Sequence, residues 1–290
     1  MFRSRSNERS ENMDNHSDWK TNLHTHTSRC GHASGTPDEL CKAALDSGLR
    51  TLGFSDHGPF PDNGFCKSRM DFSELPDYCR DIREARKKYP DLTIFAGLEI
   101  EYRPAFSNEY YQDYLLGELD LDYLIGAAHY AFMPDGTIHP FYGRSWETPE
   151  VLNEFVRQTI RTMEKLPILY MAHPDCMGHV AGKITPELKS GFRDIIAAAA
   201  DLHIPLEINA NGLRKPMLDT EDGKRFCYPL ESFWELAAEN GKIRTVIGTD
   251  AHSVDVIADF KASAEFARKF GLKICNDEVA EELALKLESR

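Results

Sequence analysis

The feature that most constrains the fold of this 290-residue chain is a regular alternation between short apolar runs and longer amphipathic segments. Seven runs have the length and composition of strands, at residues 19–23, 51–55, 92–96, 122–126, 168–172, 205–209 and 244–248. Strands that alternate with helices favour a parallel sheet with helices outside it. No glycine-rich phosphate turn follows the first run, and polar groups follow nearly every run. We therefore expect a distorted (β/α)7 barrel rather than an open doubly wound sheet.

The segments between the strands carry helix signals. Thr36 and Glu39 can form a capping box, and Pro37 suits the first helical position. Helices are expected at 36–48, 73–89, 110–119, 148–165, 186–202 and 230–240, with a helical region from residue 254 on. No linker or change in composition marks a second domain. We expect a flexible, polar extension over residues 1–19 and a single domain over residues 20–290.

The net charge and the pattern of cysteines limit which binding partners and which cellular compartment we expect for this protein. The formal net charge is −13, which disfavours nucleic acid and anionic membranes because both attract clustered Lys and Arg. The seven cysteines are scattered and form no C-x-x-C pair, so a reducing cytoplasm is expected rather than a disulfide framework. No apolar run approaches the roughly 20 residues that span a bilayer. The sequence leaves the oligomeric state open.

Histidines and carboxylates follow six of the seven predicted strands. The carboxyl ends of the strands in a βα barrel open on one face, so these side chains are expected to converge there. The candidate donors are His24, His26, His32, His57, Glu99, His129, His173, Asp250 and His252. Each could instead be a simple hydrogen-bonding or capping group, but that alternative would have to hold at six separate places. Clustered nitrogen and oxygen donors without thiolates favour Zn, Mn or Fe(II) over Cu(I).

These motifs resemble the signature of the PHP phosphoesterases, a family named for polymerase and histidinol phosphatase. The matching residues are His24-Thr-His26, Asp56-His57, Gly97-Leu-Glu99, His129, His173 and Asp250-Ala-His252. The resemblance extends over roughly residues 20–270, and the stretches 69–70, 97–102, 122–126 and 211–216 are most similar to stand-alone histidinol-phosphatases. It implies hydrolysis of L-histidinol phosphate to L-histidinol and phosphate, a reaction of histidine biosynthesis.

The resemblance also implies three divalent ions and their ligands. The first ion would take His24, His26, Glu99 and Asp250; the second would share Glu99 and add His129 and His173; the third would take His32, His57 and His252. The implied catalytic residues are Glu99, Asp250 and Arg214. Arg214 matches the position that holds the substrate phosphate, and Lys215 and Arg69 are further candidate substrate contacts. Bound metal charge would let an acidic protein hold a small phosphorylated substrate.

Several assignments stay open. The second phosphate-binding arginine could be Arg69, Arg144 or Arg161, and the general acid could be Asp56, Asp175 or His179. Glu101 could hold a substrate amine or be a solvated surface charge. The stretch 172–179 differs from the family's usual sequence after the fifth strand, a difference that bears on the substrate rather than on the metal chemistry.

Other functions fit the sequence less well. A PHP phosphoesterase acting on another small phosphorylated metabolite or nucleotide is the nearest alternative. A metal-dependent amidohydrolase commonly needs a carbamylated lysine after the fourth strand, and no lysine stands between Gly126 and Gly136. A PHP nuclease or proofreading module would need a basic groove, which the net charge does not favour. The complete donor set and Arg214 argue against a metal-storage protein or scaffold.

Overall fold

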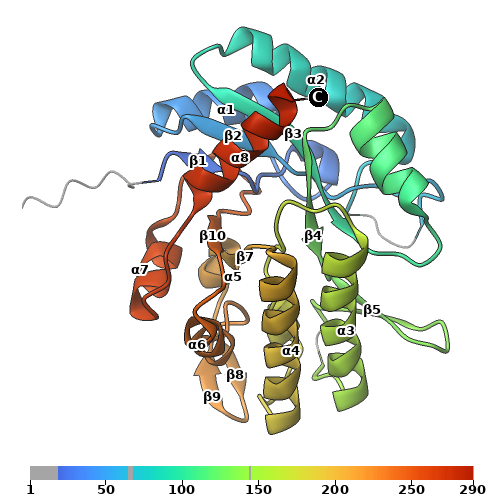
Figure 1. The fold of residues 1–290 in the computed structure, drawn as a ribbon, viewed down its shortest axis with the longest axis vertical. Helices are drawn as coiled ribbons and strands as arrows, with labels where there is room; N and C mark the ends of the chain where they lie inside the picture. Colours follow the sequence, from blue (N-terminus) through green and yellow to red (C-terminus); the bar gives the residue numbers. More distant parts are fainter. Residues whose placement is uncertain (1–18, 65–67, 144, 290) are drawn as a thin grey trace, which may run out of the picture.

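A computed structural model describes residues 19–64, 68–143 and 145–289 (Figure 1). Apart from residue 19, the predicted N-terminal extension lies outside the described residues, as does Arg144. Among the described helices, none is both long and apolar enough to cross a membrane.

A curled parallel sheet forms the centre of the fold. Four strands pair side by side in chain order: β1 (Thr21–Asn22), β2 (Thr51–Phe54), β3 (Thr93–Glu101) and β4 (Tyr123–Ala127). A second parallel pair joins β7 (Leu206–Asn209) to β10 (Thr245–Gly248). Single bridges connect the two groups, from Met171 to Gly126 and to Leu206 at one side and from Thr25 to Ala251 at the other. The expected α/β architecture with a parallel sheet is therefore present.

The prediction of a regular fifth strand at 168–172 is wrong. Leu169, Tyr170 and Ala172 form backbone hydrogen bonds with β4, but only Met171 bridges both neighbours, and no continuous strand forms. The short helix η4 (Cys176–His179) follows. His173 has a φ of +27°, in the left-handed region, so an extended strand cannot continue through it. The segment is nevertheless placed where the fifth strand was expected, between β4 and β7.

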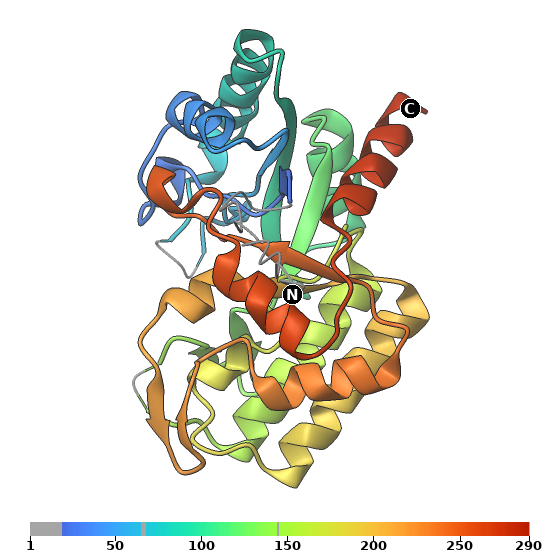
Figure 2. The ribbon, with the colours of Figure 1, turned by 90° about the vertical axis from the view of Figure 1, so that its left-hand side faces the viewer.

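Helices cover the outside of the sheet, as Figures 1 and 2 show. They are α1 (Pro37–Asp46), α2 (Leu75–Lys88), η3 (Glu109–Glu118), α3 (Pro149–Lys165), α4 (Pro186–Leu202), α6 (Glu231–Asn240), α7 (Lys261–Lys269) and α8 (Asn276–Glu288). The short helix η2 (Phe72–Glu74) precedes α2, and the short helix α5 (Ala210–Arg214) follows β7 at the carboxyl end of the sheet. The capping box of Thr36 and Glu39 is formed. The helix expected at 110–119 is a π-helix, η3. Helices α3 and α4 pack side by side beside β4 and the Met171 segment.

Two expected loops contain short hairpins. Strands β5 (Tyr130–Phe132) and β6 (Ile138–Pro140) pair after β4, and β8 (Leu218–Thr220) and β9 (Gly223–Arg225) pair after α5. The first hairpin extends away from the sheet in Figure 1.

Tyr123 fills the interior of the curled sheet. Its side chain is 3% exposed, and its hydroxyl donates to the carbonyl oxygen of Leu23 at 2.8 Å, across the sheet from β4. Gly53 and Gly97 leave space for it: a Cβ would lie 2.3 Å from the Tyr123 hydroxyl at Gly53 and 2.5 Å from its ring at Gly97. The ring therefore closes the inside of the sheet.

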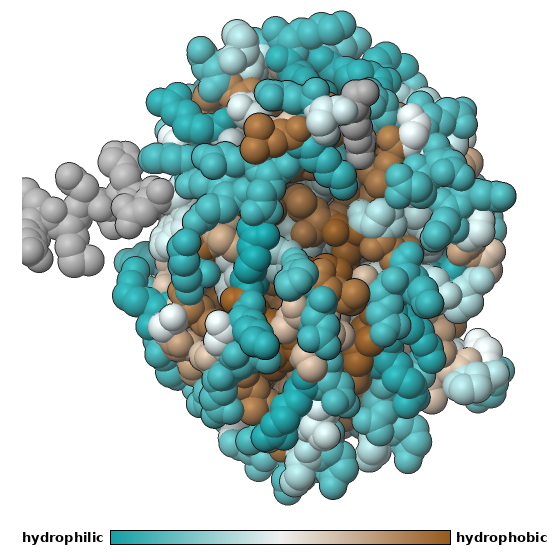
Figure 3. Space-filling view, viewed as in Figure 1, coloured by the Kyte–Doolittle hydropathy of each residue, from teal (hydrophilic) through white to brown (hydrophobic). Residues whose placement is uncertain are grey.

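Hydrophobic residues also reach the surface beside α8, in the middle of the face shown in Figure 3. A pocket of about 190 Å³ lies there, against the start of β4, with Tyr123 among its lining residues. Leu124, Ile168 and Leu283 contribute apolar surface to the same pocket. Tyr123 is thus in contact with this pocket on one side and with the sheet interior on the other.

Candidate metal centre

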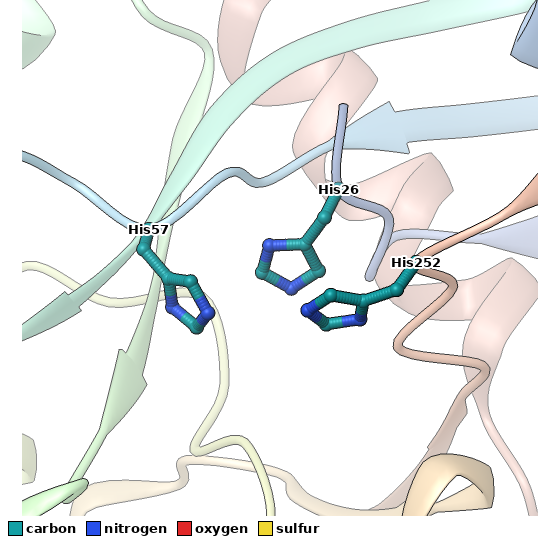
Figure 4. Close-up of side chains that lie close together, drawn as sticks. All are labelled: His26, His57 and His252. Carbon is teal, nitrogen blue, oxygen red and sulfur yellow. The ribbon is translucent and has the colours of Figure 1, made fainter. Parts of the chain in front are cut away.

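The structure brings all nine predicted donors together at the carboxyl ends of the strands. His24 and His26 follow β1, His57 follows β2, Glu99 lies on β3, His129 follows β4, His173 follows Met171, and Asp250 and His252 follow β10. Figure 4 shows the rings of His26, His57 and His252 pointing into a common space. The ring centroid of His26 lies 4.5 Å from that of His57 and 4.2 Å from that of His252.

Glu99 is the centre of the cluster. It is 1% exposed, and five histidines surround its carboxylate. The distances to its oxygens are 2.7 Å from His57 Nδ1, 2.8 Å from His173 Nε2, 3.3 Å from His129 Nε2, and 3.6 Å from the Nε2 atoms of both His24 and His26. Burial opposes ionisation, but the surrounding histidines outweigh it and hold the pKa of Glu99 well below its usual range.

Asp250 supplies a second carboxylate to the same space. Its Oδ1 lies 3.1 Å from His26 Nε2 and 3.6 Å from His24 Nε2. The amides of Asn209 and Asn211 donate to its Oδ2, at 3.3 and 3.0 Å. These amides orient the carboxylate so that Oδ1 faces the histidines. A φ of +47° at Asp250 turns the chain sharply at the end of β10, which points the side chain inward.

His32 and His252 meet at the outer edge of the cluster, with their Nε2 atoms 2.9 Å apart. The Nδ1 of His32 donates to the carbonyl oxygen of Cys30, and that of His252 donates to the carbonyl oxygen of Asp250. Because Nδ1 carries the hydrogen, each neutral ring presents a lone pair at Nε2. Burial opposes protonation of His252, but Asp250 outweighs it and raises the His252 pKa, so an Nε2–H of His252 can donate to His32 Nε2. A bound cation would take the place of that hydrogen.

Several buried polar atoms in the cluster have no hydrogen-bond partner among the described residues. They are His24 Nε2, His26 Nδ1 and Nε2, His57 Nδ1, His173 Nδ1 and Glu99 Oε2. Leaving a buried polar group unpaired costs about 1–3 kcal/mol each. Groups of three donors with ligand atoms within 4.8 Å of one another include His24, Glu99 and His173, and also His24, His26 and Asp250. The unpaired atoms and the donor set fit divalent cations.

Two further carboxylates lie behind the histidines, and sequence reasoning missed their roles. Glu207, on β7, accepts a hydrogen bond from His24 Nδ1 at 2.7 Å. Glu101, on β3, accepts from His129 Nδ1 and from Arg69, both at 2.7 Å. Burial alone would raise the pKa of Glu101, but the charge of Arg69 and the bond from His129 outweigh it and lower the pKa to about 2.

The description of Glu101 as a solvated surface charge is therefore wrong, since it is 1% exposed. Its spacing from Glu99 was an available signal, because residues i and i+2 of a strand share one face. Glu207 had a weaker signal, its place near the carboxyl end of a predicted strand.

A cavity of about 480 Å³ opens above the cluster. Six cluster residues line it, together with the cations Arg69 and Lys215. Its aromatic lining residues are Tyr130, Phe141, Tyr142 and Tyr228. Lys215 Nζ donates to the Tyr228 hydroxyl at 2.9 Å. The cavity therefore combines positive charge and flat apolar surface next to the donors.

The other predicted basic residues have different surroundings. Arg214 donates to the carbonyl oxygen of Thr249 at 2.6 Å and lies 3.7 Å from Asp259, and it is not among the residues that line the cavity. Arg161 pairs with Glu154 at 2.8 Å on α3. The interaction of Arg214 with a substrate phosphate stays a prediction.

None of the three candidate acids belongs to the cavity lining. Asp56 accepts hydrogen bonds from Thr27, and burial raises its pKa to about 7. Asp175 accepts from the Trp234 indole at 3.2 Å, and burial raises its pKa to about 6. His179 donates to the carbonyl oxygen of Phe141. All three have contacts that stabilise the structure around the centre.

Comparison with known proteins agrees with this geometry. The PHP domain model matches residues 22–211. A protein of Deinococcus radiodurans named "probable histidinol-phosphatase" is 30% identical over 243 residues, which cover 79% of this chain and 85% of that one.

Two solved structures share the fold. A candidate histidinol phosphatase of Listeria monocytogenes superposes with a TM-score of 0.68 at 21% identity, covering 84% of this chain and 99% of that one. The histidinol phosphate phosphatase of Lactococcus lactis, described as complexed with zinc, L-histidinol and phosphate, has a TM-score of 0.65 at 18% identity, covering 88% and 95%. With the match to well over half of its length, the chain belongs to the PHP domain family.

Proposed function

We propose that this protein is a metal-dependent phosphomonoesterase that hydrolyses L-histidinol phosphate to L-histidinol and phosphate, as a step of histidine biosynthesis. The observation that carries the proposal is the ring of five histidines around the buried carboxylate of Glu99, under a cavity that also holds Arg69 and Lys215. The names of the Deinococcus and Lactococcus proteins support the choice of substrate.

The proposal includes three divalent ions of Zn, Mn or Fe held by the nine donors. Glu99 would be shared between two of them, and His32, His57 and His252 would hold the third. We further propose that the single bridges at Met171 and Thr25 close the sheet as a distorted (β/α)7 barrel, and that residues 20–290 form one domain.

We propose separate roles in the reaction for the cations, the basic residues and the aromatic residues of the cavity. Bound cations would supply an activated water and would neutralise charge on the phosphate. Lys215 and Arg69 line the cavity and would donate to phosphate oxygens, Arg69 beside its contacts with Gly58 and Glu101. Such charge-assisted bonds are stronger than neutral ones. The aromatic residues of the cavity offer flat surfaces on which the imidazole ring of the substrate can stack. Arg214 would join them only by turning away from Thr249.

The function is tested by phosphate release from L-histidinol phosphate with metal-replete protein. A nucleotide phosphomonoester, an oligonucleotide and a cyclic amide are assayed beside it at equal concentration. The proposal expects L-histidinol phosphate to have the highest kcat/KM. Faster turnover of the nucleotide, the oligonucleotide or the amide would assign the centre to a different phosphoesterase, a nuclease or an amidohydrolase, respectively.

Lys215→Ala is expected to lower kcat/KM for L-histidinol phosphate by about 10–100-fold, since a hydrogen bond to a charged group contributes roughly 1.5–3 kcal/mol. The metal content should not change, because Lys215 contacts Tyr228 rather than a proposed ligand. Steady-state kinetics with elemental analysis measures both quantities.

Lys224→Ala, on the exposed hairpin strand β9, is the matched control and should leave kcat/KM unchanged. Arg214→Ala in the same series tests whether Arg214 also binds the substrate. An increased KM and a lowered kcat would show that Arg214 contacts the phosphate. A Lys215→Ala protein with wild-type kinetics would remove Lys215 from the substrate contacts.

A further inference from the structure

The carboxylate of Glu207 contacts two ligand-bearing segments at once. The residue is 0% exposed. Its Oε1 accepts from the imidazole Nδ1 of His24 at 2.7 Å, and its Oε2 accepts from the backbone N–H of His173 at 3.1 Å and from the Asn209 amide at 2.9 Å. We propose that Glu207 is a positioning residue of the metal centre, which fixes His24 and His173 in the orientations that bind cations. This inference rests on the proposed metal centre.

The contact with His24 determines which ring nitrogen is available. A carboxylate only accepts, so the hydrogen of the neutral ring is on Nδ1 and the lone pair is on Nε2. That Nε2 faces the carboxylates of Glu99 and Asp250, at 3.6 Å from each, and has no hydrogen-bond partner among the described residues. The hydrogen bond to Glu207 therefore directs the free nitrogen of His24 into the space shared by the two other carboxylates.

The contact with His173 acts on the backbone. His173 has a φ of +27°, a conformation that residues other than glycine seldom adopt, and such strain persists only where neighbouring groups hold it. The hydrogen bond from its N–H to Glu207 is one such restraint. In this conformation His173 Nε2 lies 2.8 Å from Glu99 Oε1. Glu207 thus couples a ligand after β1 to a ligand after the Met171 bridge.

The neighbouring strand is adapted to Glu207. Gly248 on β10 pairs with Asn209 on β7, and a Cβ at Gly248 would lie 1.7 Å from Glu207 Oε1. Any side chain at this position would displace the carboxylate from His24. The requirement for glycine at the end of β10 is therefore explained by the place that Glu207 occupies.

The replacement Glu207→Gln keeps the volume of the side chain but not its two acceptors. A glutamine amide can accept from His24 or from the His173 N–H, but its NH2 group then faces the other donor. Mutation of the hydrogen-bond partner of a metal-binding histidine typically lowers the metal affinity by about 10–100-fold. We expect Glu207→Gln to bind Zn²⁺ about 10–100-fold more weakly at the affected sites.

The experiment removes metal from the full chain with a chelator and titrates Zn²⁺ back against a chromophoric competitor. The ¹⁵N NMR spectrum of the histidine rings of the Zn²⁺-loaded protein is recorded beside it, because rings that keep Nδ1–H and rings that keep Nε2–H have different shifts. Glu154→Gln is the matched control, since Glu154 is also buried but pairs with Arg157 and Arg161 on α3. The control should keep the wild-type Zn²⁺ affinity and tautomers.

Gly248→Ala supplies a second variant in which Glu207 itself is unchanged. It should weaken Zn²⁺ binding in the same direction as Glu207→Gln. Wild-type affinity and an unchanged His24 tautomer in a folded Glu207→Gln protein would overturn the positioning role, and so would equal losses in Glu207→Gln and Glu154→Gln. These readouts need no substrate, so wild-type protein that binds Zn²⁺ but releases no phosphate from L-histidinol phosphate would contradict the proposed function alone.

Discussion

Replacement of Glu99 by glutamine is expected to lower kcat/KM for phosphate release by at least about 1,000-fold, because the metal contribution to catalysis is several kcal/mol and each 1.4 kcal/mol is tenfold. Glu99 is the residue on which five histidines converge, at 2.7–3.6 Å. Glutamine has the same shape as glutamate, but its neutral amide cannot balance the positive charge of the two cations that would share the carboxylate. The bound metal should fall together with the activity, as measured by elemental analysis of the purified variant.

Glu154→Gln again provides the matched control, with the same chemical change in a buried glutamate away from the centre. It should keep full metal content and kinetics close to wild type. A Glu99→Gln protein with normal metal content and normal turnover would contradict the shared-carboxylate arrangement.

Complete removal of the three proposed ions is expected to abolish phosphate release and to lower the melting temperature by about 15–30 °C. A ligand at 100 times its Kd stabilises a folded protein by about 2.7 kcal/mol per site, and about 2–4 °C accompany each kcal/mol in a chain of roughly this size. The destabilisation has a local cause: without cations, His26 and Glu99 keep buried atoms that have no hydrogen-bond partner among the described residues.

The measurement is differential scanning calorimetry of chelated and metal-replete protein, followed by activity after Zn²⁺ is returned. Addition of Mg²⁺, which binds poorly to imidazole, is the control and should restore neither property. Equal melting temperatures and full activity in the chelated protein would contradict the metal centre.

The positions of the donors could be predicted because they follow from local rules. His24 and His26 are two residues apart after a strand, and Asp250 and His252 repeat that spacing after the last strand. The carboxyl ends of parallel strands lie on one side of the sheet. The alternation of strands and helices along the sequence was therefore sufficient to predict that the donor side chains converge there. The capping box at Thr36 was predictable for the same reason.

The remaining features depend on contacts between residues far apart in the sequence. The bond between Glu207 and His24 joins positions 183 residues apart, and no local pattern encodes it. The fifth strand was expected from its apolar composition, but the left-handed backbone at His173 is imposed by tertiary contacts. The position of Arg214 depends on where Thr249 presents its carbonyl oxygen.

The position of the Tyr123 side chain bears on how substrate reaches the metal centre and how products leave it. The side chain closes the inside of the sheet and separates the donor cluster from the small pocket beside α8. Within the described part of the chain, the cavity with Tyr142 and Lys215 is lined by six of the donors, and we expect the substrate to enter through it. If both products also leave through this cavity, the product that dissociates more slowly will limit the rate of the next turnover.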